Sequence, residues 1–156
     1  MPDGSRVSDG SGVPDGAPNL QAAERVGVVL VGHGHTASQL LEAARGVLPP
    51  GSLDGVSAVD AGVGQTPQLE RLICDVLDTA DQGKGVLLLV DLLGSSPCSC
   101  GMRNAAEDGH RFAVVSGLNL AMLLKLGILD RGETDLAGLA EACADSGRKS
   151  VTTRFK

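Results

Sequence analysis

Aromatic residues are almost absent from this chain, whose 156 residues include two Phe, no Tyr and no Trp. A core must therefore be built from Val, Leu, Ile, Ala and Met, and a chain of this length has room for one domain with such a core. No apolar run approaches the length of a membrane span. No basic segment followed by an apolar one opens the chain, so we expect neither membrane insertion nor a signal peptide.

Positive charge is also scarce. The 13 Lys and Arg residues stand against 19 Asp and Glu residues, which gives a net charge of −6. This balance argues against nucleic acid and against an anionic membrane surface as partners, and it suits a basic protein. We expect a cytoplasmic protein, in which the four cysteines at 74, 98, 100 and 143 are reduced thiols.

Apolar runs alternate with helical patterns along most of the chain. Strands are predicted at 26–31, 56–60, 85–90 and 112–116. Helices are predicted at 36–48, 67–77, 97–108, 119–129 and 135–144. Thr66-Pro67 is typical of an N-cap followed by the first helical position, and Thr36 with Gln39 has the spacing of a capping box.

This alternation predicts the α/β class. We expect a doubly wound, mainly parallel sheet in the flavodoxin-like order 2-1-3-4, with helices on both faces. Residues 1–24 are rich in Gly, Pro, Ser and Asp without any period, which predicts a disordered tail before a single domain at 25–156. Val151 to Phe155 alternates in polarity, as an edge strand does.

Two reactive side chains follow neighbouring strands of the predicted sheet. His33 stands between Gly32 and Gly34 at the carboxyl end of the first strand, and Asp91 ends the third strand. Open α/β sheets place their ligand sites at this edge, so both side chains are expected to face one crevice. An imidazole there is a candidate nucleophile, general base or metal ligand, and a helix N-terminus beside it suits an anion.

The chain resembles the IIA components of the mannose-type phosphotransferase system (PTS), the bacterial sugar-uptake relay. The resemblance covers the chain from about Arg25 to its end. Its segments are Val-Gly-His-Gly at 31–34, Leu-Leu-Glu-Ala-Ala at 40–44, Leu-Leu-Val-Asp-Leu-Leu-Gly-Ser-Ser-Pro at 88–97, Gly-Leu-Asn-Leu at 117–120 and Met-Leu-Leu at 122–124.

This resemblance implies a function and two partners. His33 would be the phosphoacceptor, taking a phosphoryl group from the phosphocarrier protein HPr and passing it to a IIB component. Asp91 would match the active-site aspartate, which fixes the imidazole tautomer and stabilises positive charge on the ring. Gly34, Ser95, Ser96 and the N-terminus of the helix that follows would hold the phosphate.

The resemblance also implies a homodimer, in which the C-terminal strand pairs with the other subunit and residues 133–156 lie in the contact. It implies no cofactor. The chain departs from the usual family pattern at His35, Ser95, Cys98 and Ala121, which lie around the rim of the predicted site. These departures bear on the choice of partner more than on activity.

Two other functions stay open at the level of the sequence. The first is a regulatory phosphoacceptor, in which phosphorylated His33 controls a protein contact without any transport. The second is a small metal chelatase, in which His33 and His35 bind a metal with Cys98 and Cys100. We expect no metal site, because cysteines at i and i+2 on a helix point apart.

Overall fold

The computed structural model describes residues 24–62, 66–92 and 111–156. In this part of the chain, four parallel strands form one sheet in the order β2-β1-β3-β4. The strands are β1 (Gly27–Gly32), β2 (Ser57–Asp60), β3 (Val86–Val90) and β4 (Phe112–Ser116). The helices are α1 (Thr36–Val47), α2 (Pro67–Ala80), α4 (Leu120–Ile128) and α5 (Leu136–Lys149). The predicted fold class and strand order are confirmed.

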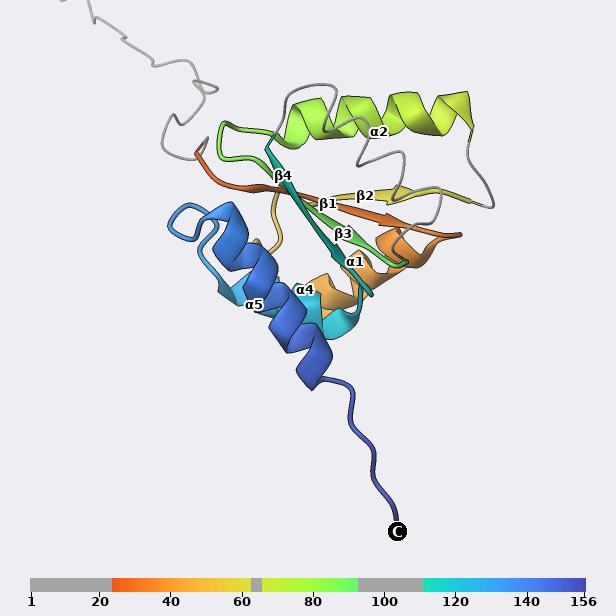
Figure 1. Cartoon of the computed structure of the whole chain (residues 1–156), viewed down its shortest axis with the longest axis vertical. Coiled ribbons are helices and arrows are strands. Elements are labelled where there is room, and N and C mark those ends of the chain that lie inside the picture. The colour runs from red at the N-terminus through yellow and green to blue at the C-terminus, as the bar shows by residue number, and fades with distance from the viewer. Residues whose placement is uncertain (1–23, 63–65, 93–110) are drawn as a thin grey trace, which may run out of the picture.

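Helices cover both faces of the sheet (Figure 1), with α2 on one face and α1, α4 and α5 on the other. Every residue of β1 and β3 is buried. Val28 and Leu30 pack in the cluster that includes α1, α4 and α5, whereas Val29 and Val31 pack in the cluster that includes α2. Central strands buried on both faces must be apolar at every position, which is the pattern seen in the sequence.

The parallel strands bring their carboxyl ends to one edge of the sheet. Gly32 is in register with Asp60 of β2, and Val31 is in register with Val90 of β3. The chain therefore leaves β1 just before His33 and leaves β3 just before Asp91. This register places the two predicted site residues on neighbouring strand ends.

The start of α1 differs from the prediction. Residue His35, and not Thr36, occupies the N-cap, and it makes no side-chain cap hydrogen bond. Instead the backbone N–H of Ser38 donates to Oδ1 of Asp60 at 3.0 Å. The predicted capping box is therefore wrong, because a carboxylate from β2 satisfies the helix N-terminus in its place. At α2 the predicted N-cap is confirmed, since Oγ1 of Thr66 accepts from the N–H of Leu69 at 3.1 Å.

The C-terminal region also differs from the prediction. Helix α5 continues to Lys149, beyond the predicted end at 144. Residues 151–156 form no strand in the single chain and extend away from the helices (Figure 1). The reason is that an edge strand exists only when a partner strand pairs with it. Val151 and Phe155 are accordingly 80% and 92% exposed.

Two predicted segments are not tested by the structure. The helix at 97–108 lies outside the described residues, as does the predicted tail at 1–24 except for Glu24. Among the described helices, none combines the length and the apolar character that a membrane crossing needs.

Candidate active site

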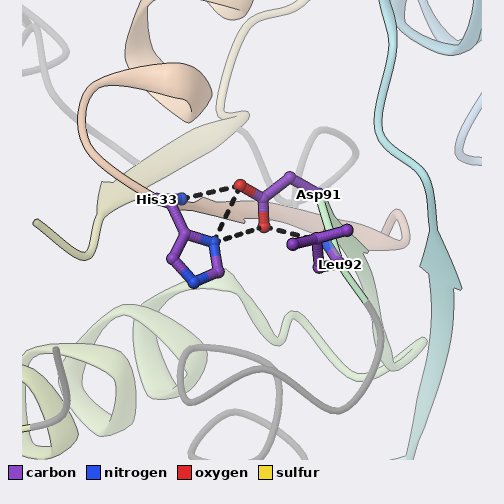
Figure 2. Close-up of polar contacts among 3 residues, drawn as sticks. All are labelled: His33, Asp91 and Leu92. Carbon is purple, nitrogen blue, oxygen red and sulfur yellow. Dashed lines mark hydrogen bonds and ion pairs between the residues drawn. The ribbon is translucent and has the colours of Figure 1, made fainter. Parts of the chain in front are cut away.

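His33 and Asp91 meet at the carboxyl edge of the sheet (Figure 2). The ring Nδ1 of His33 lies 3.1 Å from Oδ1 and 3.0 Å from Oδ2 of Asp91. The backbone N–H of His33 donates to the same Oδ2 at 2.8 Å, and the N–H of Leu92 donates to Oδ1 at 2.8 Å. The carboxylate thus holds both the ring and the main chain of His33. The sequence-based prediction that these two residues share one crevice agrees with this geometry.

Two glycines shape the chain around the imidazole. A Cβ on Gly32 would lie 3.1 Å from the backbone N of Ala37, so a larger residue would push against the start of α1. Gly34 has a φ of +54°, in the left-handed region that favours glycine. The N–H of Gly34 donates to the carbonyl oxygen of Gly62 at 3.0 Å. Gly34 therefore supplies the turn, and its N–H is engaged within the loop in this conformation.

Hydrogen bonds hold Asp91 in its ionised form. Burial alone would raise its pKa, but the backbone and ring hydrogen bonds from His33 and the N–H of Leu92 outweigh burial, and the pKa of Asp91 lies below its ordinary value. An ionised carboxylate can only accept a hydrogen bond, so Nδ1 of His33 must carry the proton. The lone pair is then on Nε2, which faces away from Asp91 (Figure 2), and the side chain is 42% exposed. The arrangement suits nucleophilic attack through Nε2.

A second imidazole–carboxylate pair lies on the other side of β1. Nδ1 of His35 is 3.4 Å from Oδ2 of Asp60, the last residue of β2. Asp60 also accepts from the backbone N–H of Ser38 at 3.0 Å and, at shorter range, from the Ser38 hydroxyl. Burial alone would raise the pKa of Asp60, but the two Ser38 bonds and His35 outweigh burial and lower it. The His35 side chain is 86% exposed.

Asp60 and Ser38 were not predicted from the sequence as members of this region. A signal was available, since Asp60 follows an apolar strand that neighbours β1, as Asp91 does. Its role as the acceptor for Ser38 is not visible in the sequence, because Ser38 stands 22 residues earlier in the chain. Only the register of β1 with β2 brings the two together.

The structure tests only some of the predicted site residues. Ser95, Ser96, Cys98 and Cys100 lie outside the described residues. The rings of His33 and His35 turn toward different strands, β3 and β2, so these two residues do not converge on one point. In the ranges that the structure describes, no three His, Cys, Asp or Glu side chains group in a way that could hold a metal ion.

The fold and the site define a class of protein: a parallel α/β protein with an imidazole–carboxylate pair at the carboxyl edge of its sheet. The comparisons with known proteins narrow this class. The family model for the PTS system fructose IIA component matches residues 27–143. The chain therefore belongs to the mannose-type (EIIA-man) family of PTS IIA components.

Individual relatives agree with this assignment. The mannose-specific EIIAB component of Escherichia coli K12 is 29% identical over 128 residues, which are 81% of this chain and 38% of that protein. The mannose/sorbose specific IIA subunit of Enterococcus faecalis aligns with a TM-score of 0.71 and 25% identity over 85% of this chain and 96% of that one. The fold is also that of the phosphotransferase system component EIIA from Streptococcus agalactiae, which aligns with a TM-score of 0.66 and 22% identity over 82% of this chain and 96% of that one.

Proposed function

We propose that this chain carries a phosphoryl group on Nε2 of His33 within a sugar phosphotransferase relay. The single observation that supports the proposal most strongly is the pairing of Nδ1 with the Asp91 carboxylate at 3.0 Å. The pairing fixes the proton on Nδ1 and leaves the Nε2 lone pair available. Membership in the IIA family makes phosphorus the electrophile to expect.

The transfer that we propose balances without any cofactor. The Nε2 lone pair of His33 forms a new bond to phosphorus while the N–P bond of a donor phosphohistidine, on the carrier protein HPr, breaks. The electron pair of that bond returns to the donor ring. His33 keeps its Nδ1 proton and becomes cationic, and the Asp91 carboxylate stabilises this charge. In a second transfer, a nucleophile of a IIB component bonds to phosphorus while the Nε2–P bond breaks, and the electron pair of that bond returns to the His33 ring.

Positioning and charge stabilisation supply most of what phosphoryl transfer needs. Ser95, Ser96 and the predicted helix N-terminus at 97 follow Asp91 closely in the chain. We therefore propose that their hydroxyl and N–H groups bind the phosphate oxygens. Gly34 contributes the turn that keeps the ring unobstructed.

The partners are part of the proposal. The Escherichia coli relative carries a B component in its name, and this chain spans 38% of that relative's length. A IIB component, encoded separately or joined to the chain, is the acceptor that we propose. In this proposal the sugar is selected by other components of the relay.

We also propose a homodimer. Strand β4 stands at one edge of the described sheet, and a cavity of about 330 Å³ lies between β4 and α5, lined by residues that include Val114, Ser116, Ala140 and Arg148. The exposed segment Val151 to Phe155 of a second copy has the alternating character of a strand for such an edge. Light scattering should find a dimer for the full chain and a monomer after deletion of residues 151–156. A full-length monomer at micromolar concentration would exclude this assembly.

The function is tested by reconstitution. The chain, mixed with phosphoenolpyruvate, enzyme I and HPr, should gain one phosphoryl group through an acid-labile, alkali-stable bond, as phosphohistidine gives. Omission of HPr is the control and should prevent the gain. An alkali-labile bond, or no gain with a matched HPr, would contradict the proposal.

A further inference from the structure

A cavity of about 220 Å³ lies at the amino end of the sheet, away from His33. It is lined in part by Gly27 at the start of β1 and Ser57 at the start of β2. His33 follows the last residue of β1, so a strand of six residues, roughly 20 Å, separates the two places. Two arginines, Arg25 and Arg131, line this cavity, which we call the guanidinium cavity.

Arg131 is fixed in place. It is 6% exposed, and its Nη2 donates to the carbonyl oxygen of Asp54. Its own carbonyl oxygen accepts from the N–H of Val26 at 3.0 Å, which ties the loop before α5 to the residue next to Arg25. A buried side chain that is held at both ends does not rearrange easily, so the direction of its guanidinium is set by the fold.

Arg25 lies against the same turn, at the residue after Asp54. A Cβ on Gly55 would lie 2.5 Å from Nη2 of Arg25, so this guanidinium lies directly against the backbone of Gly55. Gly55 follows Asp54, whose carbonyl oxygen accepts from Arg131. The two guanidiniums therefore approach one turn and border one cavity.

The charges in this cavity are not balanced by a close carboxylate. Burial and the positive charge of Arg25 together lower the pKa of Arg131 to about 10, although the Asp54 carboxylate opposes both. Among the described residues, no ion pair within 4.0 Å joins a carboxylate to Arg25 or Arg131. Buried charges in proteins are ordinarily paired, and two like charges side by side favour an anion between them.

We propose that the guanidinium cavity binds a small phosphate-bearing anion. Guanidinium groups match phosphate oxygens with paired N–H donors, and two of them balance a dianion. Ser57 and Gln82 also line the cavity, and a hydroxyl and an amide are neutral donors for such an anion. Thr79 adds a lone pair only, because its hydroxyl donates to the carbonyl oxygen of Asp75 at 2.9 Å.

The size of the cavity limits the ligand. Its volume of about 220 Å³ is below the ~300–1,000 Å³ of pockets that hold drug-sized molecules. It suits orthophosphate or a small phosphate ester. The site is independent of the phosphoryl transfer proposed for His33, because it involves binding alone and stands at the opposite end of the strands.

The test is a titration of the full ¹⁵N-labelled chain with sodium phosphate. The chemical shifts of its backbone amides are measured at each phosphate concentration. Sodium chloride at matched ionic strength is the control, and glycerol 3-phosphate forms a second arm. We expect saturable shifts at Gly27, Gly55 and Gln82 in the millimolar range. Saturation by orthophosphate alone would identify a free-anion site, and saturation by both would identify a site for the phosphate group itself.

Variants decide whether the arginines are responsible. R25Q should weaken phosphate binding by about tenfold or more, because a hydrogen bond to a charged group is lost. R45Q is the matched control: Nη2 of Arg45 donates to the carbonyl oxygen of Val56 at 3.4 Å, beside the same turn, but Arg45 lines a different cavity. R131Q removes a buried hydrogen bond and risks unfolding, so R25Q carries the test. Shifts that sodium chloride reproduces, or equal binding by R25Q and the wild type, would overturn the proposal.

Discussion

His33 and His35 stand two residues apart, and each turns its Nδ1 toward a carboxylate at the end of a strand beside β1. Asp91, which follows β3, lies 3.0 Å from the first ring, and Asp60, the last residue of β2, lies 3.4 Å from the second. The first distance is that of a good N–H···O hydrogen bond, and the second exceeds the usual range. The side chains are 42% and 86% exposed, respectively.

The two carboxylates accept hydrogen bonds from different groups. Asp91 accepts from the ring and the backbone N–H of His33 and from the N–H of Leu92, and both of its oxygens lie within 3.1 Å of the ring Nδ1. Asp60 accepts from the hydroxyl and the backbone N–H of Ser38, so it serves the N-terminus of α1. The difference teaches that a carboxylate near an imidazole does not by itself orient the ring as a nucleophile. What orients the His33 ring is a carboxylate with both oxygens close to Nδ1, at 3.1 and 3.0 Å.

The largest expected difference concerns the two histidines themselves. H33A should abolish phosphoryl uptake from HPr, because it removes the oriented nucleophile. H35A should take up phosphoryl groups nearly as the wild type does, because its ring is held weakly and faces β2. Acid-labile incorporation measured on both variants checks this. Uptake by H33A at the wild-type level would reverse the assignment of the two pairs.

The next difference concerns the carboxylates. D91N should slow transfer by roughly 10²–10⁴-fold, because the amide can donate to Nδ1 and move the ring proton to Nε2, where it blocks attack. D60N is the matched control and should leave the rate close to that of the wild type. Rapid-quench measurements of transfer from HPr give both rates. Equal slowing by the two substitutions would mean that Asp91 acts through the fold and not through the ring.

The Asp60 carboxylate should matter for the stability of the fold and not for the transfer rate. D60A should lower the free energy of unfolding by about 1 kcal/mol, because Ser38 loses the acceptor that satisfies the first turn of α1. Transfer by the folded D60A protein should remain near the wild-type rate. Urea unfolding gives the free energy. No loss of stability would show that water replaces the carboxylate at this helix end without cost.

The smallest effect is a pH dependence. Burial acts against ionisation of Asp60 and Asp91, but their hydrogen bonds prevail, and both folded-state pKa values lie below the ordinary 3.8. A lowered carboxyl pKa contributes stability that is fully present above the unfolded-state value and is lost as the pH falls through the folded-state value. The free energy of unfolding should thus be independent of these groups above about pH 5 and decline below pH 4. The double variant D60N/D91N should lose this part of the acid dependence, and an unchanged acid limb would argue against it.

Much of the fold follows from local sequence. The strands were predicted because β1 and β3 are continuous apolar runs, and the strand order followed from the parallel crossovers that such alternation requires. Helix α5 was predicted too short because its apolar period fades after residue 144. The helix continues because Gly147 is buried against Met122 of α4, which is a contact between elements.

The site divides in the same way. His33 and Asp91 could be predicted together, since each follows a central strand and topology brings those strands side by side. The pair of Asp60 with Ser38 and the burial of Arg131 could not, because they depend on register and loop packing across 22 and 77 residues of chain. Local pattern contains no information on such contacts.

The central claim is that Asp91 keeps the proton on Nδ1 of His33, so that phosphorus bonds to Nε2. Long-range ¹H–¹⁵N correlation spectra of the histidine rings, recorded before and after phosphorylation by HPr, test this directly. We predict that His33 is protonated at Nδ1 in the free chain and carries the phosphoryl group on Nε2 afterwards, while the His35 ring signals keep their pattern. A phosphoryl group on Nδ1 of His33, or on either nitrogen of His35, would contradict the account.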